Sequence, residues 1–277
     1  MSYKGLDFFN RQEKLPWFSQ MKVSSSTITI LGVGGIGCNL ALLAARLGFG
    51  EIHLIDCDSI EASNLNRQTL YSKGDIGKKK VNMAKETLDS LDNLNSEILA
   101  HDYNIFQDWN RTINITENSS IVLNGLDQPE IKRTLIGILC LSLGTPMVYS
   151  GTDPHSGYSG MVLYQASTPR APCYECLQAI LASVEDQSLK TKYTVNNIQS
   201  FDSIDWREME SEDFSQISSG ATTILIAMLS STLAMNQVIR HLHDQKCPHR
   251  IIFDLFLDSI KRFFLEKRKN CVVCQDI

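Results

Sequence analysis

The sequence predicts an α/β fold with a mixed, mostly parallel sheet that antiparallel strands extend. An apolar run that begins at Ile28 passes into a glycine turn and then into a helical pattern that ends near Gly48. A second apolar run, Glu51–Ile55, follows at once, and later apolar runs alternate with helical patterns, as in parallel βαβ units. Towards the C-terminus two apolar runs follow each other without a helix between them, which predicts an antiparallel hairpin.

The glycine turn predicts a nucleotide-binding, Rossmann-like domain. Gly32, Gly34 and Gly37 fit the pattern G-x-G-x-x-G. The first glycine permits a tight turn, the second lets the backbone approach a phosphate, and the third lets the helix pack on the strand. The N-terminus of the helix offers N–H groups to an anion, and Asp56 ends the second strand where a carboxylate can accept a ribose hydroxyl. Such a turn can also arise from packing alone, but here strand, helix and acidic residue agree.

Length and composition narrow the class of protein. With 277 residues and 43% hydrophobic content, the chain can bury a full core. A net charge of −5 without a basic block argues against a nucleic-acid partner. No apolar run reaches about eighteen residues, and residues 1–7 lack the pattern of a signal peptide. We therefore expect a soluble, cytoplasmic protein with no membrane partner.

The chain divides into a polar N-terminal arm, residues 1–27, and one domain, residues 28–277. The arm is expected to form a short helix and a linker. Residues 184–219 are polar, acidic and weakly periodic, so they are expected to be a long crossover loop. The remaining patterns predict strands at 28–31, 51–55, 97–104, 120–124, 146–149 and 160–164, helices at 81–91, 131–143 and 221–242, and a hairpin of 250–257 with 261–266.

Polar segments follow two of the predicted strands. Residues 57–68, after the second strand, are rich in Asp, Asn and Arg, and Gly125–Asp127 follows the fourth strand. Open α/β sheets bind ligands outside the carboxyl ends of their strands. Both segments are therefore candidates for one binding site.

Four of the eight cysteines form two C-x-x-C pairs, and they predict a metal site. Cys173 and Cys176 make one pair, and Cys271 and Cys274 make the other. The separation of the pairs excludes a compact zinc ribbon, but four thiolates can still close one tetrahedral Zn²⁺ centre that has no open position for catalysis. Such a centre would attach the C-terminal hairpin to the domain. A redox dithiol in each pair and ordinary buried cysteines are the alternatives.

Taken together, these motifs resemble the ThiF/MoeB and ubiquitin-activating enzyme superfamily of adenylyltransferases. Members of this superfamily bind ATP and Mg²⁺, activate a carboxylate as an acyl-adenylate with loss of pyrophosphate, and usually work as homodimers. The likeness covers nearly the whole chain, and it rests on Asn10–Gln12, the glycine turn, Asp56–Asp58, Ser63–Gln68, Gly77–Val81, Gly125–Asp127 and both C-x-x-C pairs.

The resemblance implies roles for individual residues. Asp56 would hold the ribose, and Asn64 and Arg67 would contact phosphates. Attack of a carboxylate on a phosphate brings two anions together, so positioned cations are needed. The implied catalytic residues are Arg11, which would reach the ATP site of a neighbouring subunit, Arg67, Lys80, which would neutralise phosphate charge, and Asp127, which would help to hold Mg²⁺. The implied nucleotide-binding residues are Gly32, Gly34, Gly35, Gly37, Asp56, Asp58, Asn64 and Gln68.

Three consecutive lysines leave the catalytic register open. Lys80 is favoured because Val81 follows it, as in the family. Lys78 and Lys79 are expected to be solvated charges at the start of a helix.

One departure from the family affects the expected mechanism. Thioester-forming members carry a cysteine near the start of the long apolar helix, but this chain has none between Cys176 and Cys247. Members without that cysteine include the microcin C and pantocin-type enzymes, which adenylate a ribosomally made peptide. The chain resembles the microcin C enzyme around Ile30–Gly37, Asn64–Gln68 and Cys173–Cys176, but it lacks the large N-terminal peptide-clamp extension.

The leading hypothesis is a peptide-modifying adenylyltransferase of natural-product biosynthesis, in which a nucleophile other than an enzyme thiol captures the adenylate. A second hypothesis is activation of a sulfur-carrier or ubiquitin-like protein that ends in Gly-Gly. A third is a nucleotide-binding scaffold or an NAD-dependent oxidoreductase. Tight NADH binding without competition from ATP would favour the third, although the sequence shows no residue for hydride transfer.

Overall fold

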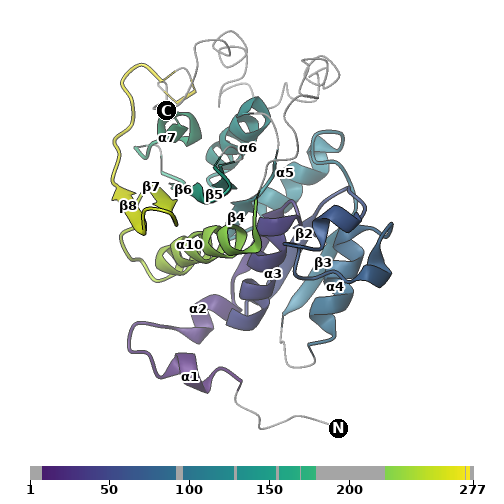
Figure 1. The fold of residues 1–277 in the computed structure, drawn as a ribbon. Coiled ribbons are helices and arrows are strands. Elements are labelled where there is room, and N and C mark those ends of the chain that lie inside the picture. Colours follow the sequence, from purple (N-terminus) through teal and green to yellow (C-terminus); the bar gives the residue numbers. More distant parts are fainter. Residues whose placement is uncertain are drawn as a thin grey trace.

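The computed structural model describes residues 8–91, 96–127, 130–153, 156–168, 170–178, 222–271 and 273–274. These residues form one eight-stranded sheet in the order β3-β2-β1-β4-β5-β6-β7-β8, with helices on both faces (Figure 1). The predicted α/β class with a mixed, mostly parallel sheet is confirmed.

The first five strands are parallel and form the half of the sheet that carries the glycine turn. They are β1 (Thr27–Leu31), β2 (Glu51–Ile55), β3 (Glu97–His101), β4 (Ile121–Asn124) and β5 (Met147–Thr152). β1 pairs with β2 on one side and β4 on the other, so the strand order reverses between β1 and β4. Such a reversal places the carboxyl ends of β1 and β4 at the position where open α/β sheets bind ligands.

The last three strands are antiparallel and extend the sheet beyond β5. They are β6 (Ser159–Gln165), β7 (Arg250–Asp254) and β8 (Ser259–Phe263). The predicted antiparallel pairing of 146–149 with 160–164 is confirmed. The terminal hairpin also forms, with shorter strands than the apolar runs predicted.

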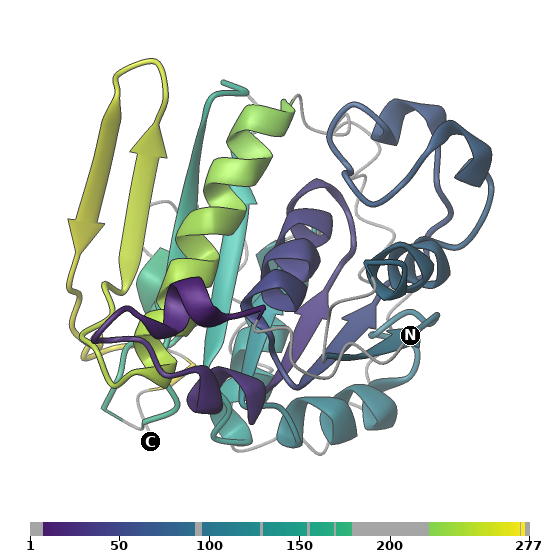
Figure 2. The same ribbon diagram turned by 90° about the horizontal axis from the view of Figure 1, so that it is seen from below.

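Two groups of helices cover the sheet (Figure 2). One face carries α3 (Gly35–Leu47), α4 (Lys80–Asp89) and α10 (Ile224–Leu242), whose apolar residues share a core with β1 and β2. The other face carries α5 (Trp109–Glu117), α6 (Glu130–Ser142) and α7 (Tyr174–Gln178). Two 3-10 turns, η1 (Ala62–Asn64) and η2 (Lys73–Asp75), lie between β2 and α4.

The N-terminal arm packs against the C-terminal end of α3. It contains α1 (Asn10–Glu13) and α2 (Gln20–Ser24), two short helices where one was predicted. The side-chain amides of Gln12 and Gln20 both donate to the carbonyl of Leu47, at 3.0 and 3.1 Å. These bonds satisfy a carbonyl that the end of a helix leaves without an internal partner.

At two segments the predicted elements and the structure do not meet. The predicted crossover, residues 184–219, lies outside the described residues, and α5 was not predicted at all. No helix in the described ranges has the length and apolar character needed to cross a bilayer.

Candidate nucleotide site and cysteine cluster

The three glycines of the turn differ in what surrounds them. Gly32 has a φ of +83°, and a Cβ at Gly37 would lie 1.9 Å from the carbonyl oxygen of Gly32. Both positions therefore exclude a side chain for structural reasons. A Cβ at Gly34 would meet only Gln68 Nε2, at 3.9 Å. No atom of the described residues explains glycine at this position, but close approach of a ligand to the backbone would.

The loop after β2 returns to the glycine turn and covers it. A Cβ at Gly35 would lie 3.2 Å from Cγ of Arg67, so the arginine side chain passes over the start of α3. Gln68 is buried, and its Oε1 has no hydrogen-bond partner among the described residues. Asn64 is buried as well, and its Oδ1 accepts from the N–H of Glu61 at 3.1 Å. Asn64 thus shapes the loop, while Arg67 and Gln68 border the turn.

Asp56 joins the ends of β1 and β2. Its Oδ2 accepts from the N–H of Val33 at 2.7 Å, and its Oδ1 accepts from the N–H of Asp58 at 2.8 Å. Burial raises the pKa of the Asp56 carboxyl above its usual value, and the positive charge of Lys80 opposes that rise. A carboxylate beside the glycine turn suits a ligand that presents hydroxyl groups.

Lys80 is the buried cation of the site. Its Nζ lies 2.7 Å from Oδ2 of Asp58, and the side chain of Lys80 is 9% exposed against 62% for Asp58. Lys78 is exposed and pairs with Asp75 at 3.0 Å, which fits the predicted solvated charge. Lys79 differs from that prediction, because its Nζ donates to the carbonyl of Cys57 at 2.7 Å and pairs with Asp102 at 3.1 Å.

Asp127 lies just beyond the carboxyl end of β4, next to the glycine turn. The N–H of Leu126 donates to Oδ1 of Asn124, and the carbonyl oxygen of Gly125 would lie 3.3 Å from a Cβ at Gly32. Asp127 itself is exposed. The segment that carries this carboxylate therefore shares the edge of the sheet with Asp56.

Among the residues predicted for the nucleotide site, Arg11 is the one that the structure does not bring to this edge. It lies exposed on α1, at the C-terminal end of α3, whereas the glycine turn lies at the N-terminal end. The thirteen residues of α3 span about 20 Å. Within one chain, α1, which carries Arg11, is thus at the opposite end of α3 from the glycine turn (Figure 1).

The structure adds polar groups that sequence reasoning missed. The hydroxyl of Tyr71 donates to the carbonyl of Val33 at 2.8 Å and so fixes the backbone of the turn. Nη1 of Arg133, in the first turn of α6, donates to the hydroxyl of Tyr149 at 2.5 Å. That hydroxyl would lie 2.4 Å from a Cβ at Gly151, near the end of β5. The only sequence feature that could have pointed to Arg133 is that it follows Asp127 by six residues.

The four paired cysteines form one buried cluster. Sγ of Cys173 lies 3.6 Å from Sγ of Cys271 and 3.8 Å from Sγ of Cys176, and Cys176 lies 3.6 Å from Cys274. All four sulfurs lie within 4.8 Å of one another. Zn–S bonds of about 2.3 Å at tetrahedral angles give S–S separations of about 3.8 Å. The observed spacings fit that geometry and are too long for disulfides.

Hydrogen bonds within the cluster lower the pKa of two thiols, Cys176 and Cys271, and raise that of the other two, Cys173 and Cys274. The N–H of Arg268 donates to Sγ of Cys176 at 3.5 Å. A hydrogen bond from Cys173 lowers the pKa of Cys176 to about 7. Hydrogen bonds from the other three cysteines, that of Cys173 first, lower the pKa of Cys271 as well. Because all four sulfurs lie together and not as two separate pairs, the cluster fits a closed structural centre better than two separate redox dithiols.

The four remaining cysteines have the opposite character. Burial raises the pKa of Cys38 to about 12 and that of Cys247 to about 11. Burial also raises the pKa of Cys140. The side chain of Cys57 is exposed, but partial desolvation of its thiol and the negative charges of Asp58 and Asp56 raise its pKa as well. None of these thiols lies in an environment that stabilises a thiolate.

The residues around the glycine turn can hold a polyanion that carries hydroxyl groups. Backbone N–H groups at the start of α3, the buried Lys80 and the overlying Arg67 supply positive charge at one edge. Asp56 supplies an acceptor beside them. A nucleoside polyphosphate has both chemical features.

Solved structures with the same fold include an enzyme described with ATP. MccB of E. coli in the structure with ATP has a TM-score of 0.74 at 22% identity, and the likeness covers 98% of this chain and 75% of that one. MccB described with a derivative of MccA gives a TM-score of 0.76 at 22% identity, with 98% and 75% covered. PaaA gives 0.64 at 23% identity, with 95% and 86% covered.

Curated relatives match a shorter part of the chain. An adenylyltransferase and sulfurtransferase uba4 from Aspergillus niger is 36% identical over 163 residues, which are 57% of this chain and 33% of that protein. SUMO-activating enzyme subunit 2 from Dictyostelium discoideum is 36% identical over 155 residues, 56% of this chain and 22% of the relative. The matches thus span a third or less of these relatives. The pattern of the ThiF family matches residues 7–273, and the chain therefore belongs to the ThiF family.

Proposed function

We propose that this protein uses ATP to convert a carboxylate of a ribosomally made peptide into an acyl-adenylate. The observation that carries the proposal is the open space in front of Gly34, bordered by Arg67 and Gln68 and adjoining Asp56 and Lys80. In this arrangement the triphosphate lies at the start of α3, and Asp56 accepts a ribose hydroxyl. Asp58 holds Lys80 in place through their ion pair.

The reaction is a displacement at the α-phosphorus of ATP. An oxygen of the substrate carboxylate forms a bond to that phosphorus, and the bond from the α-phosphorus to the bridging oxygen breaks, releasing pyrophosphate. Negative charge accumulates on the phosphoryl oxygens during this exchange. Arg67 and Lys80 offset that charge, and because Lys80 is buried, its charge is weakly screened by solvent.

Asp127 would hold the Mg²⁺ that accompanies ATP. Magnesium prefers oxygen ligands and commonly takes one or two carboxylates together with substrate phosphates. Asp127 is an exposed carboxylate beside the glycine turn, so its chemistry and position fit. The ion, when bound, supplies further neutralisation of phosphate charge.

The absence of an activated thiol supports direct capture of the adenylate. No cysteine occurs from residue 177 to residue 246, and the pKa values of Cys38 and Cys247 are raised by burial. A nucleophile of the peptide or of another molecule then attacks the acyl carbon and releases AMP. MccB, which has the same fold, has been described in complex with N-formylated MccA, which further supports a peptide substrate. We place the reaction in the cytoplasm.

The proposal is tested by incubating the protein with ATP, Mg²⁺ and short peptides encoded beside its gene. Pyrophosphate release and a peptide that has gained AMP or lost water are expected. Lys80→Met serves as the inactive control because it keeps the buried apolar stem and removes the charge. Release of pyrophosphate that is equal in the variant, or a peptide attached to an enzyme cysteine, would contradict the proposal.

A second candidate function is activation of a carrier protein that ends in Gly-Gly. The 36% identity to uba4 and to a SUMO-activating enzyme subunit supports it. Trapping an adenylate on a small Gly-Gly protein, with no reaction of the neighbouring peptides, would favour this candidate over the first.

We also propose that the cysteine cluster holds one structural Zn²⁺. Cys173, Cys176, Cys271 and Cys274 supply four thiolates, which closes a tetrahedral centre and links α7 to the chain after β8. The ion there supplies stability, not chemistry.

Finally, we propose a homodimer in which Arg11 acts on the site of the partner. The length of α3, about 20 Å, separates Arg11 from the glycine turn of its own chain. Mixing Arg11→Ala with Lys80→Met tests this, since a mixed dimer would have one intact site. Activity should return to about a quarter of the wild-type value if chains exchange freely. Two inactive proteins that stay inactive after verified exchange would contradict action in trans.

A further inference from the structure

The sheet ends in a strand with one open side. Among the described residues, β8 pairs only with β7, through the register that runs from Arg250–Phe263 to Asp254–Ser259. An edge strand presents a row of unpaired N–H and C=O groups, which can accept another extended segment. In both ribbon views the hairpin of β7 and β8 forms the margin of the molecule.

The hairpin also carries exposed apolar side chains. At its tip, Phe256 is 78% exposed and Leu257 is 72% exposed. The ring of Tyr158 packs at a tilt against that of Phe256, with centroids 4.6 Å apart, so the exposed apolar surface extends to the start of β6. Ile260 on β8 and Phe264 just after it are exposed as well. Contiguous exposed apolar groups are typical of binding surfaces.

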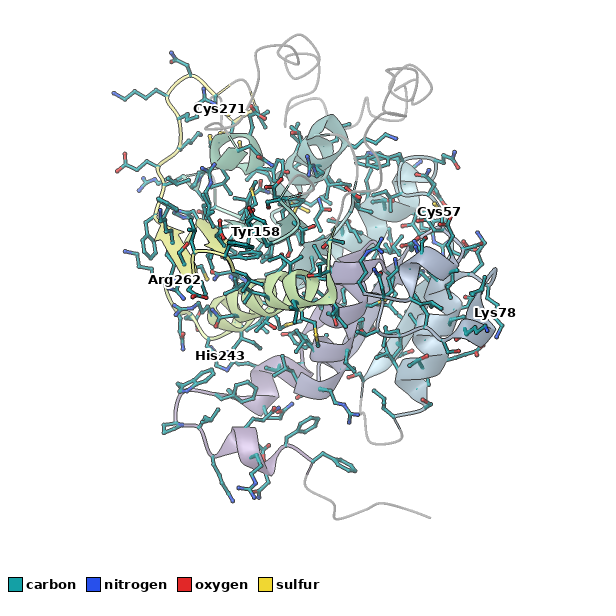
Figure 3. The ribbon with its side chains drawn as sticks, viewed as in Figure 1. Cys57, Lys78, Tyr158, His243, Arg262 and Cys271 are labelled. Atoms are coloured by element: carbon teal, nitrogen blue, oxygen red, sulfur yellow. The ribbon has the colours of Figure 1, made fainter. Side chains whose placement is uncertain are left out.

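The charge of this edge differs from that of the whole chain. β8 carries two cationic side chains and no acidic one, with Asp258 in the turn before it, whereas the chain has a net charge of −5. Lys261 and Arg262 lie on β8 itself, and Figure 3 places Arg262 at the outer margin. Lysine on an edge strand also serves to block pairing with other strands. That role alone would not leave Phe256 and Leu257 in solvent.

The same charges argue against a second copy of the chain as the occupant. Two β8 strands paired in parallel register would place Lys261 opposite Lys261, and an antiparallel pair centred on that residue would do the same. Like charges directly opposite each other destabilise a strand pair. An acidic strand would instead be attracted.

We propose that β8 binds an extended, acidic segment of the substrate peptide as an added antiparallel or parallel strand. This inference rests on the proposed function, because it assigns the occupant to the substrate. Main-chain hydrogen bonds would supply affinity, and Lys261 and Arg262 would select acidic side chains.

The topology gives this proposal a length requirement. The tip of the hairpin lies at the same edge of the sheet as the carboxyl end of β5, since Asp254 pairs with Ser159 and Gly160 pairs with Thr152. Five strand spacings separate β8 from β1, which is roughly 24 Å. About seven extended residues cover that distance. The activated carboxylate must therefore lie at least about seven residues from the bound segment.

The test measures binding of a labelled twelve-residue peptide that repeats Glu-Glu-Val-Val, so that both faces of the added strand carry carboxylates opposite Lys261 and Arg262, using the full-length protein without ATP. Arg262→Glu should weaken binding at least about fivefold, and Lys261→Glu should act similarly. Lys73→Glu is the matched control, because it makes the same change of charge. Lys73 is exposed on η2, which lies between β2 and α4 and not beside β8. That control should bind within about twofold of the wild type.

Two further probes make the result decisive. A Lys–Val peptide of equal length should not bind, and N-methylation of alternate peptide bonds in the Glu–Val probe should abolish its binding. Unchanged affinity of Arg262→Glu and Lys261→Glu, equal binding of the basic probe, or no effect of N-methylation would overturn the proposal.

Pyrophosphate release separates this proposal from the proposed function. A probe that binds β8 while no peptide or carrier yields pyrophosphate would contradict the enzymatic proposal and remove the reason to call the occupant a substrate. Both proposals would be supported by a peptide that yields pyrophosphate and also competes with the probe. At low concentration of that peptide, Arg262→Glu should release pyrophosphate more slowly, by about the factor that it loses in probe affinity.

Discussion

The glycine turn and the cysteine cluster lie at different parts of the molecule and are built in opposite ways. The labels of Cys57 and Cys271 in Figure 3 mark the two regions. At the turn, a Cβ on Gly34 would meet only Nε2 of Gln68, at 3.9 Å, among the described residues, and Oε1 of the buried Gln68 has no partner among them. At the cluster, four sulfurs face one another and are buried. One region is open to a ligand, and the other is closed.

This difference shows which region bears on function and which on stability. Buried polar atoms without partners are costly and are rare in folded proteins. At the glycine turn such an atom is understandable if a ligand completes the site. At the cluster the sulfurs already have one another, and a metal would complete a centre with no free position. Mutations in the first region should therefore reduce activity, and mutations in the second should reduce stability.

The largest expected effect is loss of stability when the cluster is broken. Cys274→Ser removes one of four thiolates, so bound Zn²⁺ should fall to a small fraction of one ion per chain. Loss of a structural metal costs about 5 kcal/mol or more, and Tm should fall by at least about 10 °C. Metal analysis and thermal unfolding measure both.

Cys247→Ser is the matched control for this prediction. Its Sγ donates to the carbonyl of Gln245 at 3.4 Å, a bond that a serine hydroxyl can keep. This variant should retain its zinc and unfold within a few degrees of the wild type. Equal zinc content and Tm in both variants would remove the structural role of the cluster.

The two regions also differ in how far sequence could predict them. The glycine turn is local, since Gly32, Gly34 and Gly37 fit one motif whose roles follow from backbone geometry. The cysteine pairs lie far apart in sequence, but C-x-x-C spacing is specific enough to predict one site. Roles that depend only on tertiary contact were not predictable. Lys79 and Arg133 have partners, Asp102 and Tyr149, that no sequence pattern indicated.

Helix prediction failed where the pattern was short and polar. The core-facing residues of α5 include Thr112 and Thr116, which are buried although they are polar. Thr112 Oγ1 donates to the carbonyl of Ile105 at 2.9 Å, so a tertiary bond offsets the burial of its hydroxyl. A periodicity of apolar residues alone could not reveal that face.

The next effect should appear in activity and leave stability nearly unchanged. Lys80→Met should lower pyrophosphate release by about 100- to 1,000-fold, because it removes a buried cation beside the site. The stability loss should stay below about 2 kcal/mol, since the stem is kept and Asp58 remains largely solvated. Lys78→Met should retain activity within about twofold, because Lys78 is exposed and pairs with Asp75. Equal losses of pyrophosphate release in both variants would contradict the choice of Lys80 as the catalytic lysine of the three.

Two glycines of one turn should respond differently to the same substitution. Gly37→Ala forces a Cβ to within 1.9 Å of the Gly32 carbonyl oxygen and should destabilise the protein by about 2 to 3 kcal/mol. Gly34→Ala meets no close protein atom, so it should fold normally and weaken ATP binding about tenfold through steric conflict with the ligand. Denaturant unfolding and ATP titration separate the two effects. Normal ATP affinity in folded Gly34→Ala would show that the open space has another purpose.

The smallest effect is a dependence on pH that acts in opposite directions on binding and on stability. Burial raises the pKa of Asp56, so its carboxylate is protonated at a higher pH than an exposed aspartate. As pH falls through that pKa, the group loses acceptor capacity for a ribose hydroxyl, and ATP affinity should fall. Asp56→Asn should bind ATP about tenfold more weakly at neutral pH and should lack this acidic decline.

The stability of the ligand-free protein should change the other way. Between the unfolded and folded pKa values the native state binds more protons at Asp56 than the unfolded state does. The contribution of Asp56 to the free energy of unfolding therefore rises as pH falls through the folded value, and it levels off below the unfolded value. The difference between wild type and Asp56→Asn isolates this term from other carboxylates. The contrary outcome is that, relative to Asp56→Asn, the wild type loses both ATP affinity and ligand-free stability as pH falls. Asp56 would then be a structural anchor whose charge the fold requires, and the glycine turn would be less open to a ligand than its geometry indicates.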